Sequence, residues 1–298
     1  MSGAFHIPVL LEEAIGFLDV SRPGLYIDGT FGLGGHSLEI LKRNPRAELV
    51  GVDIDERALA EAGARLRPYA GRVRLFQSDF RYIPDLEIDL TSLRGVLLDL
   101  GMSSFQLDDP ARGFSFQTEG PLDMRMDFRN RTTAAGIIAK YSEHRLAEIF
   151  RAYGELKQAT PLARRIVTLR KAAPIETTTA LCRIVEDVCR WHPQKGKIHP
   201  AAKVFQALRI EVNGELAGLP EFLERMADAA PAGARFVILS FHSLEDRAVK
   251  KTFLRLAARD DGKPVFRILT RKPVVPGEDE ILRNPRSRSA KLRAGERI

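Results

Sequence analysis

Apolar and polar positions follow two kinds of pattern along the chain, one typical of strands and one of helices. Short apolar runs of β type occur at 25–27, 49–52, 73–76, 95–98, 235–241 and 266–270. Among them lie amphipathic stretches at helical spacing, from about residue 10, from about residue 37, over 56–66 and over 244–258. Strands that alternate with helices predict an α/β fold, a parallel sheet with helices packed on its faces.

The middle of the chain keeps only the helical rhythm. Helices are predicted at 134–141, 143–153, 160–172, 178–188 and 201–212, with prolines at 174, 193 and 200 marking breaks between them. We therefore expect a helical subdomain at 109–215, inserted into a discontinuous domain made of 1–108 and 216–298. The segment after residue 270 is basic and rich in proline, and it is predicted to be flexible or extended. Its arginines suit phosphate contacts or a solvated tail.

A glycine-rich loop follows the first predicted strand. Gly32 and Gly34 let the backbone approach a ligand closely, and the next helix offers free N–H groups to an anionic group. The second strand stops at Asp53, which is placed to accept hydrogen bonds from ribose hydroxyls. A dinucleotide pattern would need a third glycine where Ser37 stands. NAD is therefore disfavoured but stays open, while the carboxylate end of S-adenosylmethionine could use the same loop.

Acidic residues also end the other predicted strands. Asp99 ends the fourth strand, and the third runs into Asp79 and Phe80. In open parallel sheets a ligand lies beyond the carboxyl ends of the strands, so these side chains would flank it. An acceptor beside a flat ring suits adenine. Phe80 can equally belong to the core.

Composition narrows the class of protein. The chain has 298 residues, 44% of them apolar and 29% charged, which is ordinary for a soluble globular protein. Its 46 Lys and Arg against 39 Asp and Glu give a net charge of +7, which favours a polyanionic partner. Cys182 and Cys189 form no disulfide framework and no plausible zinc site. No apolar run is long enough to span a membrane and no secretory pattern is seen, so a cytoplasmic location is expected.

Six motifs together resemble the MraW family. They are Asp28-Gly-Thr-Phe-Gly-Leu-Gly-Gly-His-Ser, Leu98-Asp-Leu-Gly-Met-Ser-Ser-Phe-Gln-Leu-Asp-Asp, Arg112-Gly-Phe-Ser-Phe, Gly120-Pro-Leu-Asp-Met-Arg-Met-Asp, Phe205-Gln-Ala-Leu-Arg-Ile and Ser240-Phe-His-Ser-Leu-Glu-Asp-Arg. The resemblance runs from about residue 6 to residue 293. It implies a Rossmann-like, S-adenosylmethionine-dependent methyltransferase. The expected reaction is methylation of the exocyclic N4 of a cytidine in the decoding region of small-subunit ribosomal RNA.

The resemblance also implies site residues. The loop residues would hold the methionine end of the cofactor, Asp53 its ribose and Phe80 its adenine, with further contacts from two polar residues. The cofactor-binding positions are thus Gly34, Gly35, His36, Asp53, Phe80, Asp99 and Gln106. Without the family, His36 would be interpreted as a capping or surface histidine and Gln106 as part of a loop.

The catalytic residue is less defined. The N4 amine is a poor nucleophile, so catalysis needs alignment with the methyl group and an acceptor for the proton. Many DNA amino-methyltransferases carry an Asp/Asn-Pro-Pro-aromatic loop after the fourth strand, but here Asp99 is followed by Leu-Gly-Met-Ser-Ser. Asp99 and His242 are the candidates near the target amine. His242 can equally anchor a loop. Arg125 and Arg209 are candidate RNA contacts, or structural residues.

Three alternatives stay open from the sequence. A DNA amino-methyltransferase is disfavoured by the missing Pro-Pro-aromatic loop. A cofactor-binding ribosome assembly factor without catalysis keeps the same motifs. An NAD-dependent oxidoreductase is disfavoured by Ser37 and the basic C-terminal segment. The sequence predicts no metal site and no membrane partner. It leaves open whether free RNA or the assembled small subunit is the substrate, and whether the chain forms a homodimer.

Overall fold

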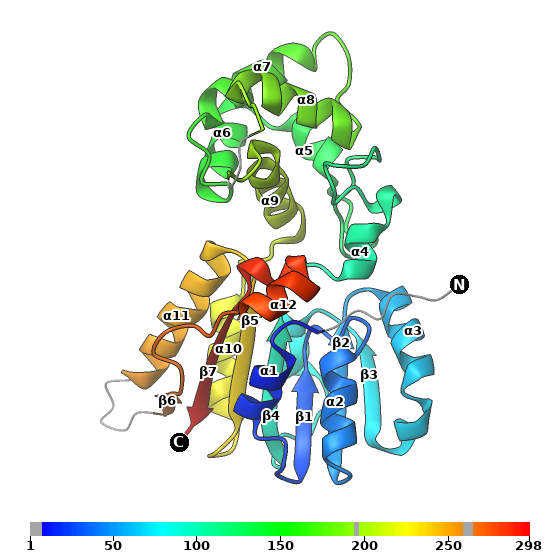
Figure 1. Cartoon of the computed structure of the whole chain (residues 1–298), viewed down its shortest axis with the longest axis vertical. Helices are drawn as coiled ribbons and strands as arrows, with labels where there is room; N and C mark the ends of the chain where they lie inside the picture. The colour runs from blue at the N-terminus through cyan, green and yellow to red at the C-terminus, as the bar shows by residue number, and fades with distance from the viewer. Residues whose placement is uncertain (1–7, 194–196, 259–264) are drawn as a thin grey trace. The chain divides into compact units, whose positions relative to one another are not determined.

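The computed structural model describes residues 8–193, 197–258 and 265–298. The chain divides into two compact units (Figure 1). Unit 1 comprises residues 1–101 and 216–298, and unit 2 comprises residues 102–215. The predicted first boundary lies after residue 108, whereas unit 1 ends its first segment at Gly101.

Unit 1 is built on a sheet of seven strands in the order β3-β2-β1-β4-β5-β7-β6. The strands are β1 (Gly24–Asp28), β2 (Ala47–Asp53), β3 (Val73–Gln77), β4 (Leu93–Asp99), β5 (Arg235–Ser240), β6 (Phe266–Ile268) and β7 (Lys291–Arg297). Strands β1 to β5 pair in parallel, and β7 runs antiparallel between β5 and β6. The chain moves outward from β1 to β3 and then returns to β4. This places a topological switch point between β1 and β4, and it confirms the predicted Rossmann-like α/β class.

Helices cover both faces of this sheet. One buried cluster joins one face of the strands to α1 (Leu11–Leu18), α2 (Gly35–Arg43) and α3 (Glu56–Arg65). The other joins the opposite face to α10 (Leu219–Ala229) and α11 (Ser243–Ala257). Neighbouring residues of a strand enter different clusters, as with Tyr26 and Ile27 in β1. A strand whose two faces are both buried has a continuous apolar sequence, which is why these strands could be found from sequence.

The regular structure in the described part of unit 2 is helical, apart from one isolated bridge between Pro121 and Thr177, and residues 113–133 form an irregular segment. Its helices are α4 (Ser104–Asp108), α5 (Ala134–Lys140), α6 (Glu143–Ala152), α7 (Ala159–Leu169), α8 (Thr178–Cys189) and α9 (Pro200–Asn213). Helix α9 is the most enclosed of them and carries Val204, Phe205 and Leu208 in the core. Figure 1 shows α5 to α9 as one group of helices, in green.

The C-terminal segment differs from the prediction. Instead of a flexible or extended tail it forms α12 (Glu278–Arg283), a 3-10 turn and strand β7. Leu292 and Ala294 are buried in the sheet, and the intervening Arg293 is buried against Asp246 at 2.6 Å. Charged residues in a strand hide its apolar pattern, so the pattern did not indicate a strand here. Among the described residues, every helix is too short or too polar to cross a membrane.

Candidate functional site

The carboxyl ends of the parallel strands gather acidic residues on one edge of the sheet of unit 1. Strand β1 ends at Asp28, β2 at Asp53 and β4 at Asp99. His242 follows two residues after the end of β5. The shared direction of these strands therefore brings together residues that lie more than 200 positions apart.

The glycine loop is tied directly to the second of these acids. Asp53 accepts the Gly32 N–H at 2.6 Å through Oδ2 and the Asp55 N–H at 2.8 Å through Oδ1. Gly32 and Gly34 have φ of 51° and 70°, in the left-handed region that favours glycine. A Cβ on Gly35 would lie 2.5 Å from Pro8 Cγ. The loop therefore needs its glycines, and Asp53 fixes its shape as well as offering lone pairs.

Asp28 is a member of this edge that the sequence analysis did not single out. It is 2% exposed, and it accepts the Ser37 hydroxyl at 2.7 Å and the Thr30 N–H at 3.3 Å. Burial raises its pKa to about 6. The charge of Asp53 raises the pKa further, whereas the hydrogen bonds from Ser37 and Thr30 lower it. Ser37, read only as a departure from a dinucleotide pattern, is thus the residue that holds Asp28.

Asp99 is the least satisfied acid of the edge. Its backbone N–H donates to Thr30 Oγ1 at 2.5 Å. Its Oδ1 is buried and accepts no hydrogen bond within the part of the chain that the structure describes. Burial, with the charges of Asp28 and Glu245, raises its pKa to about 8. A buried acceptor without a donor is costly, so this atom marks a place for a ligand.

His36 lies beside Asp99. Its Nδ1 is 3.8 Å from Asp99 Oδ2, which is too long for a hydrogen bond. Its Nε2 is 3.1 Å from the Val9 carbonyl oxygen, which can only accept, so Nε2 carries the proton. The ring is buried in the first turn of α2. Its side chain therefore ties α2 to the segment before α1, next to the Asp99 carboxylate.

Phe80 begins the 3-10 turn after β3. Its ring meets Phe222 of α10 edge-on, with centroids 5.1 Å apart, and it remains partly exposed. The neighbouring Asp79 is held by Arg81 at 2.5 Å. Phe80 thus packs on the core and keeps part of its ring available to a flat ligand.

His242 is the N-cap of α11. Its Nδ1 accepts the Glu245 N–H at 3.3 Å, and the Glu245 carboxylate accepts the backbone N–H groups of Phe241 and His242. Its Nε2 lies 3.2 Å from Glu245 Oε1, and the side chain is 6% exposed. Nε2 makes no hydrogen bond within the described residues, so the ring is fixed through Nδ1, an arrangement in which the histidine anchors a helix end.

Three expected residues belong to unit 2. Gln106 is 5% exposed and closes a capping box with Ser103 at the start of α4. Arg125 pairs with Asp123 at 2.7 Å. Arg209 forms two hydrogen bonds of 2.8 Å with Glu215. The two arginines therefore serve the internal structure of unit 2.

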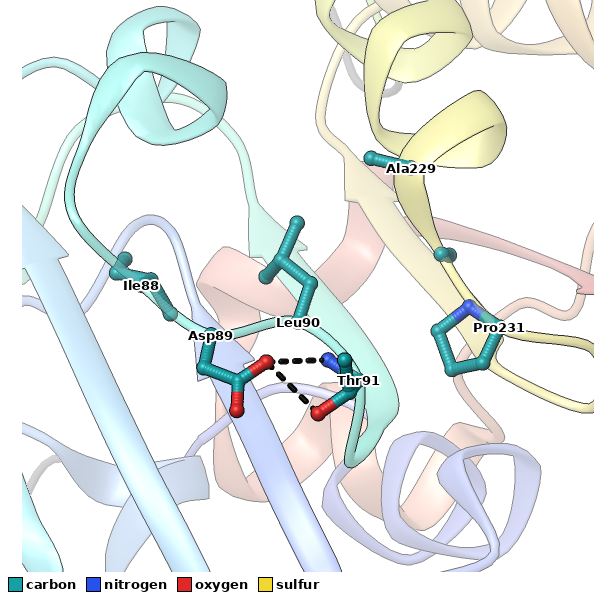
Figure 2. A pocket seen from close by; sticks show the side chains of 7 residues that line it. Ile88, Asp89, Leu90, Thr91, Ala229 and Pro231 are labelled. Carbon is teal, nitrogen blue, oxygen red and sulfur yellow. Dashed lines mark hydrogen bonds between the residues drawn. The ribbon is translucent and has the colours of Figure 1, made fainter.

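A surface hollow lies on the opposite edge of the sheet of unit 1. Figure 2 shows the loop 88–91, which precedes β4, facing Ala229 and Pro231 at the end of α10. The Asp89 carboxylate there accepts the Thr91 N–H and hydroxyl. The hollow holds no unsatisfied buried polar group among the described side chains, and it lies away from the acidic edge.

The acidic edge fits a ligand that carries positive charge and hydroxyl groups. S-adenosylmethionine, the cofactor expected from sequence, has a sulfonium, an ammonium and two ribose hydroxyls. Asp99 offers an unused acceptor, and Asp53 has lone pairs left beside the glycine loop. A Cβ on Gly32 or Gly101 would meet no heavy atom closer than 3.7 Å, which leaves open space along the loop ends. These residues therefore fit the cofactor.

The family model and the sequence relatives agree on one family. The MraW methylase family model matches residues 3–298. A ribosomal RNA small subunit methyltransferase H of Desulfotalea psychrophila is 47% identical over 298 residues, covering 98% of both chains. The protein with the same name from Carboxydothermus hydrogenoformans is 46% identical over 308 residues, covering 98% of both chains. A putative methyltransferase from Streptococcus mutans, solved in complex with SAH, aligns over 98% of this chain at 12% identity and a TM-score of 0.45.

Proposed function

The chain belongs to the MraW methylase family, and we propose that it methylates small-subunit ribosomal RNA with S-adenosyl-L-methionine as the methyl donor. The target atom in this proposal is the exocyclic N4 of a cytidine in the decoding region. The observation that carries the proposal is the Asp99 carboxylate at the end of β4, which has one buried oxygen that accepts no hydrogen bond among the described residues. The names of relatives at 47% and 46% identity support RNA as the substrate.

The proposed cofactor contacts follow the edge of the sheet. When bound, S-adenosylmethionine supplies an electrophilic methyl group on a positively charged sulfur. Asp53 accepts from the ribose hydroxyls while it holds Gly32, and Gly34 and Gly35 bring the backbone close to the methionine end. Phe80 offers its exposed part to the adenine. Gln106 and His36 complete the proposed set, with His36 also fixing the segment before α1.

Asp99 has two proposed tasks. An ionised carboxylate attracts the cation, and an acceptor beside the methyl group can orient the target amine, whose lone pair is delocalised into the cytosine ring. Its raised pKa of about 8 also suits a group that takes up a proton. His242 stays a candidate for contact with the amine. Its place in the helix cap favours an indirect role, through Glu245.

Unit 2 is proposed to recognise the RNA. A base inside folded RNA must be exposed before an enzyme can modify it, which requires protein contacts beyond the cofactor site. Of the six motifs that resemble the MraW family, two lie wholly in unit 2 and contain aromatic residues. They are Arg112–Phe116 and Phe205–Ile210. The cytoplasm, where ribosomes are assembled, is the proposed location.

Methyl transfer from labelled S-adenosylmethionine tests the function. We expect label at a cytidine N4 in small ribosomal subunits that lack the modification, and its loss in Asp99→Asn. Asp89→Asn is the matched control, because Asp89 lies exposed at the opposite edge of the sheet. Label on DNA alone would favour a DNA amino-methyltransferase. Tight binding of S-adenosylhomocysteine with no label on subunits, RNA or DNA would favour an assembly factor.

A further inference from the structure

The two aromatic family motifs of unit 2, Arg112–Phe116 and Phe205–Ile210, meet around His199. Phe116 ends the first motif, and its ring stacks on the His199 ring with centroids 5.0 Å apart and planes 21° apart. Phe205 belongs to the second motif, and it meets Phe116 edge-on at 5.7 Å. Neither contact takes part in the site of unit 1. The two motifs therefore form a second cluster of side chains, which the proposed cofactor site does not use.

His199 is held in one orientation. As the N-cap of α9 it accepts the Ala201 N–H through Nδ1 at 3.1 Å, so the proton of the neutral ring is on Nε2. Nε2 faces Glu186 Oε1 at 3.1 Å. Cys182 lies in the same cluster, but burial and Glu186 raise the pKa of its thiol to about 11. A metal on Nε2 would require the proton on Nδ1, where Ala201 already donates. The cluster is thus a hydrogen-bonded support for the ring and not a metal site.

Trp191 also contacts the His199 ring. Helix α8 ends with Arg190 in the left-handed conformation, with φ of 47°, and the Trp191 N–H bonds to the Glu186 carbonyl. This turn directs the indole onto the His199 ring at 5.0 Å and 65°. Trp191, Phe116 and His199 are all partly exposed. Three flat side chains therefore share one site at the surface, each fixed by the backbone or by its neighbours.

Exposed cations neighbour these rings along the chain. Arg183, Arg190 and Lys197 are exposed, and within the described residues none of them has an ion pair. Arg190 directly precedes Trp191 and Lys197 lies two residues before His199, while Arg183 lies on α8 seven residues before Arg190. Unit 2 as a whole contains 18 Lys and Arg against 13 Asp and Glu, so it carries most of the excess positive charge of the chain. Unpaired cations beside exposed rings are the combination that binds single-stranded nucleic acid.

We propose that this aromatic corner, formed by Phe116, Trp191 and His199 with Arg183, Arg190 and Lys197 around it, binds an unpaired stretch of the RNA substrate. The inference rests on the proposed function and names the surface of unit 2 that recognises the RNA. A base stacks on Trp191 or Phe116, and the cations contact the flanking phosphates. Stacking and phosphate contacts are tolerant of sequence, so the corner selects single strands over duplexes.

The fluorescence of Trp191 gives a direct test, because it is the single tryptophan of the chain. A short single-stranded oligoribonucleotide is titrated into the full-length protein, and its fully paired duplex serves as the comparison. We expect the single strand to quench Trp191, and the duplex to change it little at the same concentration. Unchanged fluorescence at concentrations where a labelled copy of the same strand binds would overturn the proposal.

Variants separate stacking from charge. Trp191→Ala is expected to weaken binding of the labelled single strand about tenfold, and Trp191→Phe, which keeps a ring, by much less. Arg190→Ala and Lys197→Ala are each expected to reduce the salt dependence of binding by about one phosphate contact. Controls are Tyr82→Ala, a 60% exposed aromatic residue of unit 1, and Lys171→Ala, an exposed cation elsewhere on unit 2.

The outcomes distinguish this inference from the proposed function. Folding of each variant is checked by circular dichroism, and cofactor binding by titration with S-adenosylhomocysteine. If the native protein methylates RNA and Trp191→Ala, Arg190→Ala and Lys197→Ala bind and methylate it as well as the controls do, the corner is not an RNA surface. If the native protein binds S-adenosylhomocysteine but methylates no RNA, the proposed function fails, whatever the corner binds.

Discussion

At the scale of single residues, the site is governed by how many carboxylates can be ionised together. Asp28 is buried and Asp99 is partly buried. The charge of Asp53 raises the pKa of Asp28, and the charges of Asp28 and Glu245 raise the pKa of Asp99. Such groups share protons until a cation arrives. A site of this kind is matched to a positively charged methyl donor, because a bound cation stabilises the ionised carboxylates.

Asp99 should therefore make stability depend on pH. Its pKa is about 8 in the folded protein against a usual value of 3.8, so the folded state binds the proton more tightly than the unfolded chain. The stabilisation is complete below about pH 4 and is lost as the pH rises through about 8. Between pH 5 and 9 we expect urea unfolding of the cofactor-free protein to lose on the order of 3 kcal/mol from this group.

Asp99→Asn provides the comparison for this prediction. The amide cannot ionise, so the variant should lose less stability than the native protein over the same pH range, and it should bind S-adenosylhomocysteine more weakly. Asp89→Asn is expected to follow the native curve. Identical slopes for the native protein and Asp99→Asn would contradict the assignment of the raised pKa to Asp99.

Sequence reasoning found part of this site, for a physical reason. Asp53 and Asp99 could be identified because they end apolar strands, and strand direction fixes which edge they share. Asp28 ends a strand too, but its role depends on Ser37 and Thr30, whose hydroxyls contact it or Asp99 only in the folded loop. Glu245 was missed because it acts through a helix cap, which sequence spacing alone does not separate from ordinary surface acids.

At the scale of elements, the start of α11 decides what His242 does. The histidine accepts the Glu245 N–H, and Glu245 accepts two backbone N–H groups in return. We expect His242→Ala to lower the free energy of unfolding by about 1 kcal/mol through loss of this cap. Asparagine also caps helices well, so His242→Asn should keep most of the stability and bind S-adenosylhomocysteine normally.

Methyl transfer by His242→Ala and His242→Asn distinguishes a capping role of His242 from a catalytic one. Asparagine cannot act as a general base near neutral pH. If His242 serves only the cap, His242→Asn should retain activity within about threefold of the native rate. A threefold change corresponds to only about 0.6 kcal/mol in the activation free energy. A loss of a hundredfold or more in a stable His242→Asn variant would assign the histidine a chemical step.

Strand β7 makes a prediction of its own. Asp246 of α11 contacts Arg293 at 2.6 Å and Lys291 at 3.5 Å. Burial favours the neutral acid, but these cations outweigh it and hold the Asp246 pKa below its usual value. Asp246→Ala would leave Arg293 buried without its partner, so we expect a loss of about 3 kcal/mol in denaturant unfolding. Glu61→Ala, an exposed acid of α3, is the control and should change little.

The pH dependence of this contact has the opposite sign to that of Asp99. Because the Asp246 pKa is lowered in the folded protein, its contribution is present above about pH 4 and disappears as the pH falls below it. Asp246→Ala should therefore differ most from the native protein near neutral pH and least in acid. An equal difference at all pH values would point to packing instead of the ion pair.

At the scale of the whole molecule, the parallel core and the helical insertion could be predicted because each has a clear pattern of apolar residues. Strands β1, β2, β4 and β5 bury apolar residues on both faces, and unit 2 repeats apolar residues at helical spacing. The position of β7 could not be predicted. It joins β5 to β6 from the far end of the chain, and its stability comes from Asp246 and the sheet, neither of which lies near it in sequence.

The charge of the chain separates its two proposed ligands. The net charge of +7 is concentrated in unit 2, while the cofactor-binding edge of unit 1 is acidic. RNA binding releases counterions from phosphates, so affinity for single-stranded RNA should fall about a hundredfold between about 50 and 200 mM salt if roughly five phosphates are contacted. S-adenosylhomocysteine has no phosphate, so its affinity should change by less than about threefold. Parallel titrations of one preparation check both expectations. RNA binding that ignores salt would mean that the positive charge of unit 2 does not meet a phosphate backbone.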